Sequence, residues 1–232
     1  RDGRDFWVSS PTTVEIFDAL SYQSIHAFDT RGKTFHVLCE VGEHVWAACD
    51  QSLCIFHTSS YKLIHTVQNA HAHKIMAIIN DKSREDKVWT SEQNASIVKI
   101  WCGKTFELLW QLDCANIMKV YDPASTLRSS EPTTSSTVYL HASEMGVVMA
   151  YKHAIYLIDC ENRQQIQFKT FQSQDVTTMV AHYHKQSKMV CCWSASQDGS
   201  LVLSHITPQH CLSSDDSNEY AASSSSSSSS SP

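Results

Sequence analysis

The sequence predicts an all-β protein built as a β-propeller, and two observations carry this prediction. A short apolar alternation ends five times along the 232-residue chain, at intervals of 39, 45, 57 and 46 residues. A period of about 40 to 45 residues with several strands per unit is typical of propeller blades. The runs between these points are short, rich in β-branched and aromatic residues, and bounded by Gly, Asn, Asp and Ser, as strands are. The five alternations end at Phe17, Phe56, Trp101, Ile158 and Ser204.

The strands of the first, second, third and fifth units follow from this alternation. The first unit begins at its second strand, with strands at 6–8 and 14–17. The second unit has strands at 34–41, 45–49, 52–57 and 62–67, and the third at 74–79, 87–91, 97–101 and 106–112. The fifth unit has strands at 176–182, 189–194 and 200–205, and then stops. The sequence therefore predicts about five blades and an incomplete ring.

The fourth unit leaves its first strand open between two segments, 117–121 and 138–140. Its later strands are expected at 146–151, 154–159 and 164–170. Residues 112–121 and 173–183 could be drawn as short helices, but neither shows a clear cap followed by a stripe of period 3.6, so strands are preferred. The long interval of this unit predicts an insertion loop at about 122–137.

Composition divides the chain into two parts. Residues 1–212 hold the repeats, and residues 213–232 form a serine-rich tail. The tail has almost nothing to bury and is expected to be disordered, because it cannot offset the entropy of ordering. The chain begins at Arg1, and we expect further domains of a parent protein upstream.

Charge and hydropathy narrow the possible partners. The net charge is −6, which gives no basic footprint for nucleic acid. No apolar run approaches the roughly 18 residues of a membrane span. The nine cysteines are an odd number and lie in or beside strand patterns, which favours reduced thiols in a cytoplasmic protein.

Residues with catalytic or metal-binding chemistry do not form a known pattern. The closest histidine pairs are His71 with His73 and His182 with His184, and no third and fourth ligand follows at the spacing of a zinc site. The sequence contains no Gly-x-Ser-x-Gly elbow and no glycine-rich phosphate loop. We therefore expect no metal, no cofactor and no enzymatic activity.

Several residues resemble the motif of the WD-repeat family. Asp198 and Gly199 lie between two predicted strands, and Asp198 lies six positions before Ser204, as Asp50 does before Phe56. Trp101 is similar to the closing tryptophan of that family, and His71 to its histidine before the first strand. Ser91 then stands where the family has its second-strand serine. In no unit is the hydrogen-bonded His–Ser–Asp–Trp set of the family complete.

This resemblance implies a divergent WD-repeat propeller. Such propellers occur near the C-terminus of large cytosolic signalling proteins, for example DENN- or Rho-type exchange factors, Roco kinases and kinase scaffolds. The implied function is a scaffold for protein–protein interaction whose partner the sequence does not name. The alternative is a propeller enzyme or a small-ligand binder that uses the central channel.

Loops that join one unit to the next share one rim of a propeller, and loops on a rigid scaffold commonly carry binding residues. The predicted partner-binding rim comprises Arg31, Lys33, His71, His73 and Lys74.

Overall fold

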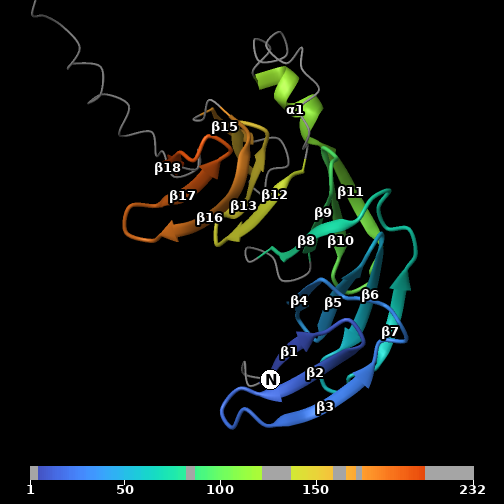
Figure 1. Cartoon of the computed structure of the whole chain (residues 1–232). Helices are drawn as coiled ribbons and strands as arrows, with labels where there is room; N and C mark the ends of the chain where they lie inside the picture. The colour runs from blue at the N-terminus through green and yellow to red at the C-terminus, as the bar shows by residue number, and fades with distance from the viewer. Residues whose placement is uncertain (1–4, 82–86, 122–136, 159–165, 171–173, 207–232) are drawn as a thin grey trace, which may run out of the picture.

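The chain forms five separate antiparallel sheets (Figure 1). The structure, a computed structural model, describes residues 5–81, 87–121, 137–158, 166–170 and 174–206. Blade 1 contains β1 (Asp5–Ser9), β2 (Thr13–Asp18) and β3 (Ser24–Asp29), and blade 2 contains β4 (Val37–Val41), β5 (His44–Cys49), β6 (Ser52–His57) and β7 (Leu63–Val67). Blade 3 contains β8 (Ile75–Asn80), β9 (Lys87–Glu92), β10 (Ile97–Cys102) and β11 (Leu108–Asp113), and blade 4 contains β12 (Tyr139–Ser143), β13 (Gly146–Tyr151), β14 (Ala154–Ile158) and β15 (Ile166–Thr170). Blade 5 contains β16 (Val176–His184), β17 (Met189–Ser196) and β18 (Leu201–Ile206).

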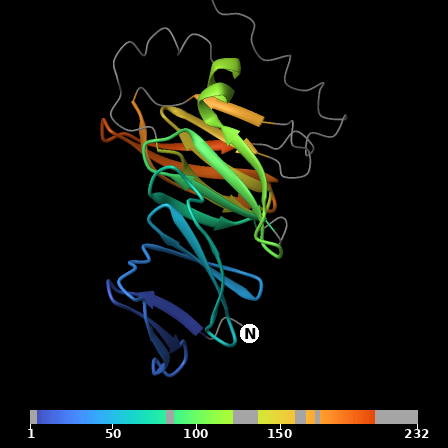
Figure 2. The ribbon, with the colours of Figure 1, turned by 90° about the vertical axis from the view of Figure 1, so that its right-hand side faces the viewer.

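Within each blade, strands that follow one another in the sequence pair side by side. The first strands of blades 2 to 5 contact one another in chain order, β4 with β8, β8 with β12 and β12 with β16. The blades stack face to face along an open arc (Figures 1 and 2). The prediction of an all-β propeller with about five blades and an incomplete ring is confirmed.

The structure decides between the two segments left open for the first strand of blade 4. It is β12, which overlaps the segment 138–140, whereas residues 117–121 belong to helix α1 (Cys114–Tyr121), so the preference for a strand there was wrong. Asp113 caps the helix, because its Oδ1 accepts a hydrogen bond from the amide of Ala115 at 3.0 Å. Cys114 and Met118 lie four positions apart, so they share one helix face, and both are buried against blades 3 and 4. The cap and the apolar stripe are present, but two turns are too short for the periodicity to be recognised.

Two predicted segments lie largely outside the described residues, the insertion at about 122–137 and the tail at 213–232. No helix in the described ranges is long and apolar enough to cross a membrane. The seven cysteines in those ranges are free thiols.

The core lies between the blades. Trp46 in β5 and Trp89 in β9 are fully buried, and each belongs to a cluster of apolar side chains that joins its blade to the next one. The alternation of each strand explains this arrangement, since successive side chains point to opposite faces of a blade. Every internal blade therefore buries two apolar faces, one against each neighbour.

An aromatic clasp recurs at two of these interfaces. We use this name for a tryptophan on one blade together with an aromatic residue in the turn between the last two strands of the next blade. The ring centroids of Trp7 and Tyr61 lie 5.9 Å apart, and those of Trp46 and Phe106 lie 5.8 Å apart. Tyr61 and Phe106 have positive φ angles of 57° and 64°, which are uncommon for bulky residues. The turns tolerate this conformation because it directs each ring onto the preceding blade.

Candidate partner-binding rim and the His71 network

The loops predicted to form the rim are held together by backbone hydrogen bonds. The β5–β6 turn lies beside the β7–β8 loop, because the amides of His71 and Ile75 donate to the carbonyls of Gln51 at 3.1 Å and Asp50 at 2.8 Å. The carbonyl of Lys74 in turn accepts from the amide of Gln93 at 2.8 Å, in the turn that follows β9. Strand–turn connections of blades 2 and 3 therefore form one continuous rim.

The β3–β4 loop reaches the same rim. A ring nitrogen of His36, Nε2, lies 2.8 Å from the carbonyl oxygen of Ile75, at the start of the next blade. Arg31 lies in a left-handed turn with φ of 53°, and its amide donates to Oδ1 of Asp29 at 2.7 Å. These bonds fix the loop that carries Arg31 and Lys33.

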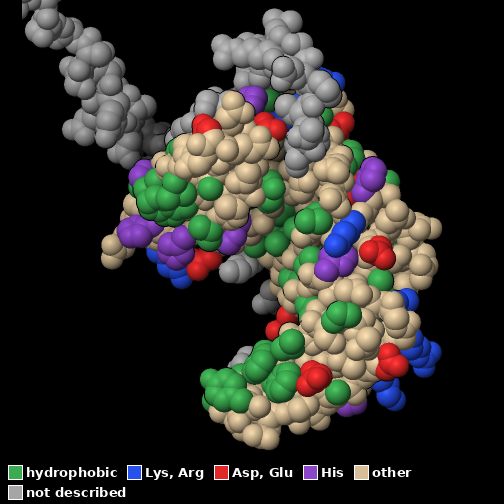
Figure 3. All heavy atoms as spheres, viewed as in Figure 1, with side chains coloured by type: hydrophobic (Ala, Val, Ile, Leu, Met, Phe, Trp, Pro, Cys, Tyr) green, Lys and Arg blue, Asp and Glu red, His purple; other side chains and the backbone are tan. Residues whose placement is uncertain are grey.

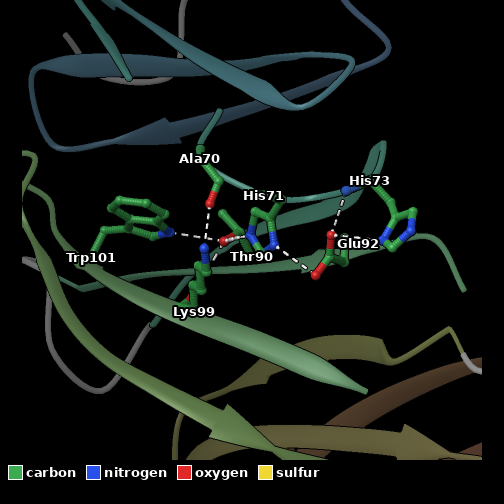
Figure 4. A network of polar contacts seen from close by, with 7 residues as sticks. All are labelled: Ala70, His71, His73, Thr90, Glu92, Lys99 and Trp101. Carbon is green, nitrogen blue, oxygen red and sulfur yellow. Dashed lines mark hydrogen bonds and ion pairs between the residues drawn. The ribbon is translucent and has the colours of Figure 1, made fainter. Parts of the chain in front are cut away.

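The structure divides the predicted rim residues into two groups. Arg31, Lys33, His73 and Lys74 are exposed, as contact residues must be. His71 is only 2% exposed, so its assignment to a contact surface is wrong. Its side chain points into the interface between blades 2 and 3, where it belongs to a network of polar contacts (Figure 4).

Thr90 in β9 is the centre of that network. Its Oγ1 lies 2.7 Å from Nε2 of His71 and accepts a hydrogen bond from Nε1 of Trp101 at 2.8 Å. All three side chains are buried, and they come from the β7–β8 loop, β9 and β10. One hydroxyl thus joins a loop and two strands inside the protein (Figure 4).

This arrangement corrects the assignment of Ser91. Thr90, not Ser91, occupies the position between the histidine and the closing tryptophan. Thr90 and Trp101 are on the face of blade 3 toward blade 2, whereas Ser91 is on the opposite face, since a slip of one residue reverses a side chain in a strand. The buried Oγ of Ser91 makes no hydrogen bond in the described part of the chain.

Glu92, the last residue of β9, adds a carboxylate to the network. Its carboxylate is buried, and Oε1 lies 3.5 Å from Nδ1 of His71. Oε2 accepts a hydrogen bond of 2.6 Å from the amide of His73 and lies 3.3 Å from Nδ1 of that residue. Glu92 therefore fixes the backbone of the β7–β8 loop and faces one buried and one exposed imidazole.

Lys99 in β10 completes the network from below (Figure 4). Its Nζ donates to the carbonyl oxygen of Ala70 at 2.6 Å, one residue before His71. The β7–β8 loop is thus attached to blade 3 through Thr90, Glu92 and Lys99.

Burial lowers the pKa of His71 to about 4. Glu92 opposes this shift, and Lys99 adds to it. His71 is therefore neutral near pH 7. Its Nε2 lies 2.7 Å from the Thr90 hydroxyl, which accepts from Trp101 and donates to the carbonyl of Lys99 at 3.4 Å.

The two turn aspartates, Asp198 and Asp50, make different hydrogen bonds, one through its side chain and the other through its backbone carbonyl. Oδ1 of Asp198 accepts hydrogen bonds from the amide of Ser200 at 2.8 Å and from the hydroxyl of Ser196, in the turn between β17 and β18. Gly199 has φ of 80°, which explains the glycine there. Asp50 has φ of 50° and an exposed side chain, and it acts through its backbone carbonyl.

Sequence reasoning missed Thr90, Glu92 and Lys99. Their spacing relative to His71 and Trp101 was visible, but only the strand register shows which of them face the same side. In the described ranges no three His, Cys, Asp or Glu side chains gather so as to hold a metal ion.

We predict that Thr90→Val destabilises the protein by about 2–4 kcal/mol, because it removes the partner of two buried groups, the His71 ring nitrogen and the Trp101 indole N–H. Thr90→Ser should retain most of the stability. Chemical denaturation monitored by tryptophan fluorescence measures both variants. The matched control is Ser91→Ala, which removes an unpartnered hydroxyl and should cost much less. Equal losses for Thr90→Val and Ser91→Ala would contradict the network.

We also predict that stability falls with acidification through His71. Its unfolded pKa is near 6.5 and its folded pKa is about 4, so below pH 6.5 the unfolded chain binds a proton that the folded chain excludes. This contribution is complete above pH 6.5 and is lost as the pH falls toward 4, by up to about 3 kcal/mol. The free energy of unfolding should therefore decrease more steeply for wild type than for His71→Gln. Parallel pH profiles would show that His71 does not titrate in this way.

Comparison with known proteins agrees with this propeller architecture. The crystal structure of a computationally designed protein, Ika8, superposes with a TM-score of 0.63 at 15% sequence identity, over 89% of this chain and 57% of that chain. The chain thus spans little more than half of the designed protein, and the likeness shows the fold alone. No curated protein sequence matches the chain. A family model described as the LRRK2 beta propeller matches residues 34–220. The chain therefore belongs to the LRRK2 beta propeller family.

Proposed function

We propose that this propeller is a protein-interaction and regulatory domain of a larger cytoplasmic signalling protein. In this role the domain catalyses no reaction and acts by presenting binding loops on a rigid scaffold. Membership of the LRRK2 beta propeller family supports this function, because that family takes its name from the propeller of a larger protein.

The observation that carries the proposal is the construction of the rim. The β3–β4 and β7–β8 loops hold their backbones in place through His36, Asp50 and Glu92, while Arg31, Lys33, His73 and Lys74 remain exposed. A loop that is already ordered loses little entropy on binding. Binding energy is therefore available for partner contacts.

The chemistry of these side chains defines the partner class. Three of the four exposed side chains are permanent cations, and the fourth is an imidazole. The carboxylate of Glu92 is buried below the surface, and two exposed carboxylates, Asp29 and Asp50, lie in the same connections and reduce the positive charge of the rim. Complementary charge steers association and selects partners. We therefore propose an acidic segment of a protein partner as the ligand of this rim.

A charge-reversal experiment tests the proposal. The triple variant Arg31→Glu, Lys33→Glu and Lys74→Glu should lose the salt-sensitive protein partners that the wild-type domain retains in affinity capture followed by mass spectrometry. The control is Lys62→Glu, Lys104→Glu and Lys119→Glu, which makes the same change in net charge at exposed positions outside the rim. The control should retain those partners. Equal retention by both triple variants, or equal loss, would overturn the assignment of the rim.

A further inference from the structure

Thr34 is an exposed residue of the β3–β4 loop, within the proposed partner-binding rim. Residues 31–34 are exposed without interruption, between the buried Thr30 and the buried Phe35. The hydroxyl of Thr34 makes no hydrogen bond within the described part of the chain. It is therefore open to a reagent that approaches from solvent.

The residues before Thr34 match what a basic-directed protein kinase selects. Such kinases use carboxylates to recognise a cation three positions before the target hydroxyl, and they prefer arginine there. Arg31 holds that position, and Lys33 directly precedes Thr34. In the whole 232-residue sequence no other Ser or Thr follows an arginine at this spacing, and one, Thr90, follows a lysine, Lys87. Because Thr90 is the buried centre of the polar network, Thr34 is the accessible hydroxyl of this kind.

The backbone around Thr34 can open without disturbing the blades. Two surface hydrogen bonds shape the turn before it, from the amide of Lys33 to the carbonyl of Thr30 at 3.2 Å and from the amide of Arg31 to Oδ1 of Asp29 at 2.7 Å. Since the exposed stretch buries no apolar side chain, its opening is a local event of low cost. Phe35 is 4% exposed and marks the point where the fixed part of the blade begins.

A phosphate at position 34 would reverse the charge of the rim. Arg31, Lys33 and Lys74 supply three positive charges and the exposed Asp29 and Asp50 two negative ones, so these connections carry a net charge of +1. Figure 3 shows basic and acidic side chains beside one another along the right-hand edge of the arc, next to blades 1 and 2. A phosphothreonine carries nearly two negative charges near pH 7, which makes the net charge about −1. The phosphate also attracts the same cations that an acidic partner needs.

We propose that Thr34 is the acceptor of a separate, basic-directed protein kinase, and that its phosphorylation releases an acidic protein partner from the rim. In the transfer step, Oγ1 of Thr34 attacks the γ-phosphorus of ATP and forms a new P–O bond. The bond from this phosphorus to the oxygen that bridges the β- and γ-phosphates breaks, and ADP leaves with the electron pair. The hydroxyl proton passes to the catalytic aspartate of the kinase. Release of the partner rests on the function proposed above, whereas the phosphorylation does not.

Phosphorylation is tested on the purified chain with ATP and the catalytic domain of calcium/calmodulin-dependent protein kinase II. Peptide mass spectrometry should locate the phosphate on Thr34 in most chains and on Thr90 in none. Arg31→Asn retains a residue suited to positive φ and should lower the kcat/KM of the kinase by about tenfold. The control Lys62→Gln removes one charge at an exposed position outside the rim and should leave kcat/KM unchanged.

Three results of this experiment would overturn the proposal. The first is a chain without phosphate on Thr34, and the second is an equal kcat/KM for Arg31→Asn and Lys62→Gln. The third is phosphate on Thr90 as well as on Thr34, because the kinase would then have modified unfolded chains.

Release is tested with a fluorescent poly-glutamate peptide as the probe of the rim. The unmodified chain should bind this peptide in a salt-sensitive manner, and the phosphorylated chain should bind it roughly tenfold more weakly. Thr34→Ala treated with kinase and ATP is the control and should bind like the unmodified chain. Equal binding before and after phosphorylation would overturn the release. Failure of the unmodified chain to bind the peptide would instead overturn the proposed function and the release with it, while phosphorylation of Thr34 is decided by the first experiment alone.

Discussion

Face-to-face packing of neighbouring blades is the constraint on which this structure depends. A four-stranded sheet with apolar side chains on both sides is stable only when both sides are covered. Trp46 and Trp89 meet this need at internal interfaces, and Tyr61 and Phe106 accept positive φ angles so that their rings cover the preceding blade. Backbone strain in the turns is offset by burial between the blades.

The Thr90 network holds the β7–β8 loop against blade 3. Within it, Glu92 accepts from the His73 amide and faces Nδ1 of His71. A buried carboxylate, a neutral imidazole and a shared hydroxyl lie together at the blade 2–blade 3 interface, with Nδ1 of His71 3.5 Å from Oε1 of Glu92. The loop that carries the exposed His73 and Lys74 is attached to this network through Glu92 and Lys99, so that part of the proposed rim is held by buried polar contacts.

Much of the fold could be predicted from the sequence because strand alternation and the spacing of the repeats are local properties. The strands of blades 2, 3 and 5 and the inter-blade positions of Trp46 and Trp89 follow from them. Helix α1 was missed because it replaces a strand over only two turns. The His71 site was predicted in part. Its histidine and tryptophan were recognised, but Ser91 was chosen over Thr90, since both have hydroxyls and only the register with β10 separates their faces. The aromatic clasp could not be foreseen, because Tyr61 and Phe106 occupy a conformation that their residue types rarely adopt.

The clasp is the most direct test of the packing account. A double-mutant cycle with Trp46→Leu and Phe106→Asn, measured by chemical denaturation, isolates the interaction between the two rings from their separate contributions. Packing of the two rings across the blade 2–blade 3 interface predicts a coupling energy of about 0.5–1.5 kcal/mol. Additivity of the two substitutions within about 0.3 kcal/mol would contradict it, because the rings would then contribute nothing to each other's stability.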